Sequence, residues 1–384
     1  MGVQLSRVFL KLGLALIPFM SLRLGTTTLS DIFLIGAIFT VAPSVLRYRS
    51  FNPVHNSSVA YYVIFMSGLA SSLLSLDPAN SVVALLKFFI MIFGYTFLIR
   101  IHLLLGSRST SFLNAYLYGS SLFAIQYIVG YYTFFQEQSD GRFEGLSDHV
   151  TNAAGSILIG VAINLNTVLS RHPKLVNLAL QPILMWALIL TGSISSFIAF
   201  TITLLVAAIS HSSAKFKFLL FFSMTLFLVS FLIQKLGAYD FVERFRSATS
   251  GRYNTSQSRI FNWKSSLDGI LSSLHSLLLG SGLDKDSGLI ESKSLEVLQV
   301  HNSLLQLLYQ GGLIFSVGVI VLVRRALSIA KRFSVSDARV LVYPCVSALF
   351  FSMTSPLMNS RYIWFPFLLS LANFDLNMQP AKGK

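Results

Sequence analysis

Residues 300–323 read VHNSLLQLLYQGGLIFSVGVIVLV, a short polar stretch followed by an apolar run long enough to cross a bilayer. The run from Leu304 to Val323 predicts a helix, with Asn302 and Ser303 available to cap its first turn. His301 lies directly before it and offers an imidazole that can accept a proton from a hydroxyl near neutral pH. Because any helix start can contain a histidine, the role of His301 has to be judged from the rest of the chain.

The composition of the whole chain has the same apolar character. Of the 384 residues, 54% are hydrophobic and 11% are charged, and the mean hydropathy is +0.68. These values exclude a soluble globular protein and predict a polytopic membrane protein. The net charge of +14 does not indicate nucleic-acid binding, because Lys and Arg occur in short clusters between apolar runs. The single cysteine, Cys345, excludes a disulfide framework.

The pattern of apolar windows predicts the fold. We expect an all-α polytopic membrane protein, a single membrane domain over residues 1–384 with about 12 transmembrane helices of the usual ~17 to 25 residues. No small-residue cleavage site follows the first window, so we predict an uncleaved first span. The windows lie near residues 8–24, 31–46, 59–76, 81–99, 112–135, 151–169, 175–191, 194–209, 218–235, 303–323, 340–356 and 361–376.

The distribution of basic residues predicts the orientation. In the short loops, Lys and Arg are concentrated on the side that holds the amino terminus, which places both termini in the cytoplasm. Acidic residues gather on the opposite side, in a loop at 136–151 and in a long, partly helical loop at 236–302. Four histidines are predicted to be solvated in cytoplasmic loops, namely His55, His102, His172 and His211.

A group of arginines makes the long outer loop a candidate anion-binding site. Guanidinium groups bind phosphate bidentately, so several together can hold a pyrophosphate without a metal. The alternative is a solvated surface or an anchor for anionic lipid headgroups. The group comprises Arg244, Arg246, Arg252 and Arg259, interleaved with Phe245 and Tyr253 and followed by Phe261 and Trp263.

The residues that follow the arginines predict a helix at the membrane surface. Residues 258–283 are typical of a short amphipathic helix that carries Trp263 at headgroup depth and ends at Gly280-Ser281-Gly282. These glycines are not a nucleotide-binding fingerprint, because no βαβ unit surrounds them.

The sequence predicts a site without a metal. The outer histidines His149, His275 and His301 are dispersed along the chain, and no HExxH or CxxC motif occurs. We therefore predict a metal-independent site.

Three features together resemble the O-antigen polymerase and O-antigen ligase superfamily of bacterial membrane glycosyltransferases. They are the R…W…L…LLGSGL pattern of Arg259 to Gly282, the stretch HNSLLQLLYQGG from His301 to Gly312, and the predicted topology with its late, long periplasmic loop. The resemblance implies transfer of a glycan from undecaprenyl pyrophosphate at the periplasmic face of the inner membrane, with no nucleotide sugar and no cofactor. It also implies that Arg259 contacts the pyrophosphate, that His301 activates the acceptor hydroxyl, and that Asn302 completes the motif.

The chain departs from the pattern of that superfamily at two places. After Gly192, where the superfamily often has Ser-Arg, this chain has Ser193-Ile194, so one phosphate contact is absent or supplied elsewhere. Where the ligase form has glycine, threonine or tyrosine, this chain has Phe315, which favours a polymerase. The segment from Gly141 to Asn152, in the first outer loop, resembles a short Arg/Gly-containing loop of the superfamily, which makes Arg142 a candidate to bind the sugar; the alternative is a solvated turn.

The leading interpretation is a polymerase of lipid-linked oligosaccharide repeat units. The alternatives are a ligase whose acceptor is lipopolysaccharide core, and a non-enzymatic lipid-glycan flippase or transporter, which is disfavoured because Lys87 is the only charge well inside a predicted span. The expected partners are the lipid-linked glycan donor and acceptor, membrane lipids and a chain-length regulator membrane protein. The predicted site comprises His301 and Arg259 as catalytic residues and Arg244, Arg246, Arg252, Asn302 and Arg142 as substrate-binding residues.

Overall fold

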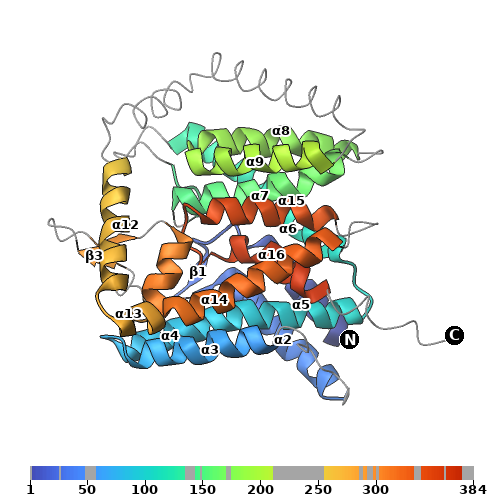
Figure 1. The fold of residues 1–384 in the computed structure, drawn as a ribbon. Coiled ribbons are helices and arrows are strands. Elements are labelled where there is room, and N and C mark those ends of the chain that lie inside the picture. Colours follow the sequence, from blue (N-terminus) through green and yellow to red (C-terminus); the bar gives the residue numbers. More distant parts are fainter. Residues whose placement is uncertain are drawn as a thin grey trace. The chain divides into compact units, whose positions relative to one another are not determined.

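A computed structural model divides the chain into two units, each with its own packed helices (Figure 1). The first unit comprises Met1–Phe51, His102–Thr249 and Ala330–Phe351, and the second comprises Asn52–Ile101, Ser250–Ile329 and Ser352–Lys384. The structure describes residues 2–25, 27–47, 58–134, 143–147, 149–169, 174–210, 255–284, 289–291, 297–299, 302–332, 339–358 and 360–373.

The first unit is a set of packed apolar helices. Small residues let their backbones approach closely: a Cβ atom at Gly119 would overlap the carbonyl group of Ala15, and one at Gly160 would overlap the side chain of Ser120. Its elements are α1 (Gly2–Ala15), the strands β1 (Arg23–Leu24) and β2 (Thr27–Thr28), α2 (Leu29–Arg47), α6 (Ser109–Phe134), α7 (Val150–Val168), α8 (Leu175–Leu190), α9 (Ile194–Ser210) and α15 (Arg339–Ser352).

The amino-terminal helix differs from the prediction. The window at 8–24 was expected to be a span, but α1 starts at Gly2 and ends at Ala15, and the residues after it form turns and the β1–β2 hairpin. Pro18 accounts for the early end, because a proline disfavours helical geometry in the residue before it and cannot donate a backbone hydrogen bond.

The prediction for His102 is wrong. Helix α5 (Tyr95–Leu104) continues past the predicted window, so Arg100 and His102 lie on a helix and both are buried. The Ser6 hydroxyl donates to the Ala37 carbonyl at 2.7 Å and therefore accepts from Nε2 of His102, 2.9 Å away. A hydrogen-bond partner on α1 thus makes burial of this imidazole possible. The other three histidines lie outside the described residues.

The second unit contains two of the predicted site residues that the structure describes, Arg259 and Asn302. Helices α3 (Ser58–Leu73) and α4 (Pro78–Phe89) form a hairpin, and α4 leads through a π-helical turn (η1, Ile90–Gly94) into α5. The aromatic ring of Phe88 lies 5.8 Å from that of Phe315 and 5.5 Å from that of Trp364, which forms a core between three helices. The remaining elements are α12 (Thr255–Leu271), α13 (Leu274–Leu279), the strands β3 (Leu289–Glu291) and β4 (Val297–Gln299), α14 (Ser303–Arg332) and α16 (Arg361–Asn373).

The protein is mostly helical, as expected, with two short antiparallel hairpins in addition. Helices occupy the predicted windows from 31–46 onward wherever the structure describes them, and the window at 218–235 lies outside that part. Among the described residues, two helices have the length and composition to cross a membrane, Pro78–Leu104 and Ser303–Lys331. The number of twelve spans stays a prediction.

Helix α14 is broken, contrary to the prediction of one continuous helix from Leu304 to Val323. Gly312 has φ 71° and ψ −176°, and α14 changes direction there (Figure 1). Glycine has the weakest helix propensity after proline, and two glycines in succession, Gly311 and Gly312, make this the easiest place to interrupt the helix.

The glycine turn after α13 replaces the hydrogen bonds that the break removes. The carbonyl groups of Tyr309 and Gln310 accept from the backbone N–H groups of Ser281 at 2.9 Å and Gly282 at 3.0 Å. The approach is so close that a Cβ atom at Gly280 or at Gly312 would overlap the opposite backbone. The turn and the break therefore depend on glycine at both places.

We predict that Gly312→Ala destabilises the protein by about 2 kcal/mol or more, because the alanine is strained at positive φ and its methyl group meets the Leu278 carbonyl. Gly106→Ala is the control, since Gly106 has φ 84° but open space around it, and strain alone should cost about 1 kcal/mol. The measurement is thermal unfolding of both variants in detergent. If both variants lowered the melting temperature equally, the overlap with the Leu278 carbonyl would add nothing to the strain of a positive φ.

Candidate functional site

Asn302 forms the cap of α14. Its side-chain oxygen accepts from the backbone N–H groups of Leu304 at 3.0 Å and Leu305 at 3.1 Å, and its carbonyl accepts from Gln306 N at 2.9 Å. Among the described residues its amide nitrogen has no partner. Asn302 is therefore the helix cap, and His301, which lies outside the described residues, is not needed for that purpose.

The first turn of α14 is fixed to the loop before α16, residues 353–360. The Ser303 hydroxyl donates to the Ser355 carbonyl at 2.6 Å, and Leu357 N donates to the side-chain oxygen of Gln306 at 3.0 Å. The indole N–H of Trp364 donates to the Leu357 carbonyl at 2.9 Å, so the loop is held from both sides. The backbone next to Asn302 is thus a rigid part of the second unit.

Helix α12 packs against this same part of α14. The absence of a side chain at Gly269 lets the ring of Tyr309 lie on α12, since a Cβ atom there would come within 2.8 Å of the ring. Asn262 and Ser266 are buried, and the Arg259 position precedes them by three and seven residues, which places all three on one side of the helix. Helical spacing therefore puts Arg259 in register with the packed face of α12.

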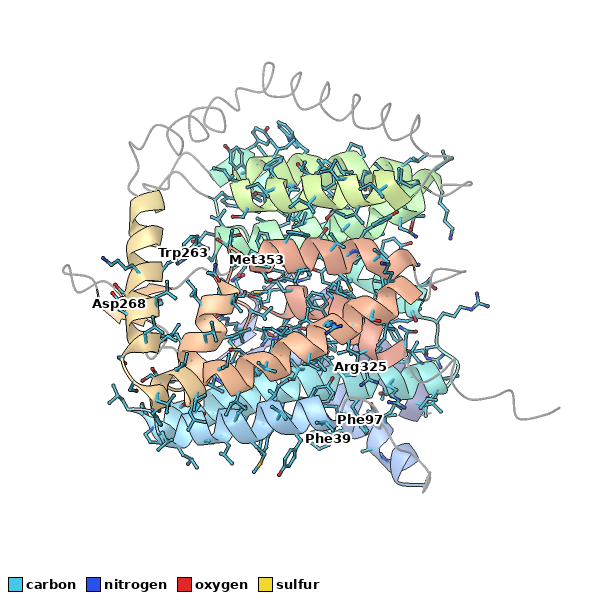
Figure 2. The ribbon with its side chains drawn as sticks, viewed as in Figure 1. Phe39, Phe97, Trp263, Asp268, Arg325 and Met353 are labelled. Carbon is cyan, nitrogen blue, oxygen red and sulfur yellow. The ribbon has the colours of Figure 1, made fainter. Side chains whose placement is uncertain are left out.

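The helix predicted over residues 258–283 consists of two helices. Helix α12 ends at Leu271 and α13 starts at Leu274, where the hydroxyl of Ser273 caps it by accepting from Ser276 N at 3.0 Å. The predicted end at the glycine turn is confirmed, with Gly280 at φ 77°. Trp263 and Asp268 project from different sides of α12 (Figure 2).

The structure brings two of the predicted site residues onto neighbouring helices, namely Arg259 and Asn302. The other candidates lie outside the described residues: His301, Arg244, Arg246, Arg252 and Arg142. His149, another outer histidine of the sequence, caps α7 in the first unit, and its Nδ1 accepts from Thr151 N at 3.1 Å. That nitrogen is therefore already engaged.

Two polar residues at this place were not singled out from the sequence. Asp284, directly after the glycine turn, is 5% exposed, and its carbonyl accepts from the side-chain nitrogen of Gln310 at 3.3 Å. Gln310 is itself 4% exposed. The sequence held two signals for them: Gln310 is an amide in a largely apolar helix, and Asp284 is an acid shortly after the glycine turn. In the described ranges, no three His, Cys, Asp or Glu side chains come together in the manner of a metal site.

The comparison with known families agrees with this geometry. Residues 182–323 match the family model described as O-antigen ligase. The match supports the resemblance to the O-antigen ligase and polymerase superfamily over this part of the chain. No curated protein matches the chain.

The region that matches the family model lacks the α3–α4 hairpin and the 353–360 loop. It includes α12 with Arg259, the turn at Gly280–Gly282, and the start of α14 with Asn302. Because the cap occupies the oxygen of Asn302, only its amide N–H groups are available to a substrate, and they can bind an oxygen of a sugar or a phosphate. The arrangement therefore offers a donor at Asn302 beside the His301 position.

We predict that Asn302→Asp and Asn302→Ser keep the stability of this O-antigen ligase region but lower turnover about tenfold or more. Both replacements cap a helix well, yet neither has an amide donor, and a hydrogen bond to a charged group contributes about 1.5 to 3 kcal/mol. Asn302→Ala should instead lose about 1 kcal/mol of stability as well. The measurements are the transfer rate and the melting temperature of the three purified variants, which separate a substrate-binding role of Asn302 from a capping role. Full turnover in both capping variants would leave Asn302 with a structural role only.

Proposed function

We propose that this protein is an inner-membrane glycosyltransferase that polymerises oligosaccharide repeat units carried on undecaprenyl pyrophosphate. The observation that carries the proposal is the contact between α12, which bears Arg259, and the first part of α14, which follows His301: Tyr309 of α14 lies on Gly269 of α12. The O-antigen ligase match over residues 182–323 supports the same reaction class. In this proposal Arg259 provides a cation that stabilises the leaving group, and His301 provides an imidazole that deprotonates the attacking hydroxyl.

The reaction follows from these two groups. The hydroxyl at the non-reducing end of the acceptor attacks the anomeric carbon of the donor glycan, and the bond from that carbon to the pyrophosphate oxygen breaks. His301 takes the hydroxyl proton as general base. The leaving lipid pyrophosphate keeps the electron pair, and Arg259, with Arg244, Arg246 and Arg252, stabilises its developing charge. No metal or other cofactor takes part in the proposed step.

The placement in the membrane is part of the proposal. The distribution of Lys and Arg supports cytoplasmic termini and a periplasmic loop at 236–302. In the second unit, α12 runs at a steep angle to α3 and α4, which supports a position along the membrane surface (Figure 1). A pyrophosphate at headgroup depth would then lie at the level of Arg259.

The acceptor is proposed to be another lipid-linked repeat unit. The support is the departure from the ligase pattern at Phe315, which is fully buried and packs under Gly311 at the break in α14. Its influence on the acceptor would be indirect, through the position of the first part of α14. A chain-length regulator in the same membrane is the proposed protein partner.

Reconstitution of the purified protein in vesicles with a single lipid-linked repeat unit tests this function. We expect a ladder of glycans that lengthen by one repeat unit at a time, unchanged by a metal chelator. Products that appear only after lipopolysaccharide core is added would identify a ligase. Movement of the intact lipid-linked unit across the bilayer with no new glycosidic bond would identify a transporter. Loss of the ladder on chelation, restored by a divalent ion, would overturn the metal-free mechanism.

His301→Asn is predicted to lower single-turnover transfer by roughly 100-fold or more without lowering the melting temperature. The rate should fall because a positioned acid or base contributes about 10²- to 10⁴-fold. The stability should stay because Asn302, not His301, caps the helix. Donor binding should also be preserved, because the pyrophosphate is bound by the arginines.

His275→Asn is the matched control for that variant. His275 is an exposed histidine on α13, in the same outer loop, and its replacement should leave transfer unchanged. If His301→Asn transfers glycan as fast as His275→Asn, the base is a different group, and an acid of the first outer loop becomes the next candidate.

A further inference from the structure

Two serine hydroxyls attach the turn after α13 to the α3–α4 hairpin. The Ser71 hydroxyl, on α3, donates to the Gln310 carbonyl at 2.6 Å and accepts from Gly282 N at 3.1 Å. The Ser81 hydroxyl, on α4, accepts from Leu283 N at 2.6 Å. Both serines are fully buried. Each of these hydrogen bonds joins a serine hydroxyl to a backbone group of the turn or of the break. They therefore fix the backbone there and not a flexible side chain.

Apolar packing encloses the same junction. Leu283 is 4% exposed, and a Cβ atom at Gly68 of α3 would lie 3.3 Å from it and 3.1 Å from the ring of Phe315. Because the two serines are buried, water does not compete for their hydroxyl groups. Their hydrogen bonds therefore favour one position of the turn on the hairpin.

A lipid-linked donor makes this attachment important for function. Its pyrophosphate is held at headgroup depth by the lipid, so a site on a loop outside the membrane must be kept at that depth by the helices inside it. The turn connects two segments that carry site residues. Helix α12, which carries Arg259, precedes the turn, and α14, which Asn302 caps, accepts hydrogen bonds from it. Fixing the turn on α3 and α4 fixes both segments at once.

We propose that Ser71 and Ser81 are positioning residues that hold the donor and acceptor sites at a fixed place on the α3–α4 hairpin. The inference rests on the proposed function for its effect on turnover, but the attachment itself can be measured without any reaction. Neither residue lies in the region that matches the O-antigen ligase family, which starts at residue 182.

The chain supplies controls next to these residues. Ser72 is adjacent to Ser71 and equally buried, but its hydroxyl has no partner among the described residues. Ser67, one turn earlier and also buried, donates to the Val63 and Ile64 carbonyls of its own helix. Ser72→Ala therefore controls for the loss of a buried hydroxyl, and Ser67→Ala for the loss of a buried hydrogen bond.

The experiment compares Ser71→Ala, Ser81→Ala and the two control variants in the full-length protein. Spin labels at Ala79→Cys, at the start of α4, and Asp268→Cys, on α12, report how firmly the loop is attached, since both positions are exposed and Cys345 is buried. We expect the distance distribution to broaden or shift in Ser71→Ala and Ser81→Ala and to stay as in the parent protein in both controls.

Turnover is measured in the same variants without labels, with the donor in vesicles. We expect kcat to fall about tenfold or more in Ser71→Ala and Ser81→Ala with little change in KM, because a displacement of about 1 Å can cost up to 100-fold in rate. An unchanged distance distribution, or a broadened one with normal turnover, overturns the proposal. A parent protein that forms no glycosidic bond refutes the proposed function instead, and the labels alone then decide whether the two serines attach the loop.

Discussion

The hydrogen bonds between the glycine turn after α13 and the break in α14 are the interaction on which the second unit depends. A break in a helix leaves carbonyl groups without partners, and an apolar interior or a membrane offers no water to satisfy them. Here Ser281 and Gly282 supply the N–H groups that Tyr309 and Gln310 would otherwise lack. The turn therefore stabilises the break, and the break in turn helps to fix the conformation of the turn, together with the hydroxyls of Ser71 and Ser81.

This mutual dependence explains how segments far apart in sequence, α12 and the first part of α14, come to lie beside each other. If α14 were continuous, Asn302 would lie at the far end of a straight helix from Val323. The first part of α14 would then not be directed toward α12. The change of direction at Gly312 turns the first part of α14 toward α12, where Tyr309 packs on Gly269. The hydrogen bonds of Ser303 and Gln306 to the 353–360 loop then fix the same segment from its other side.

Much of this organisation could be predicted from the sequence, and the remainder could not for definite reasons. Apolar windows located most of the helices, and the glycine turn and the cap at Asn302 are local features with local signatures. The break at Gly312 was missed because the apolar pattern continues across it, and only contact with a distant turn makes the interruption favourable. The burial of His102 was missed for a similar reason, since its partner Ser6 lies on another helix. Ser71 and Ser81 looked like ordinary helical serines, because nothing near them in sequence reveals a partner more than two hundred residues away.

Phe315 shows how a difference within a family can act at a distance from the chemistry. Its ring is fully buried against Phe88 and lies under Gly311, so under the proposed function Phe315 would act on the acceptor through the fold and not by contact. A glycine or threonine at this position would leave an unfilled space directly under the break, and the surrounding helices would have to move to fill it. The first part of α14 would move with them, and with it the residue that caps the helix. A preference for one acceptor over another can therefore be encoded in the core of the protein, through the direction that the break gives to the helix.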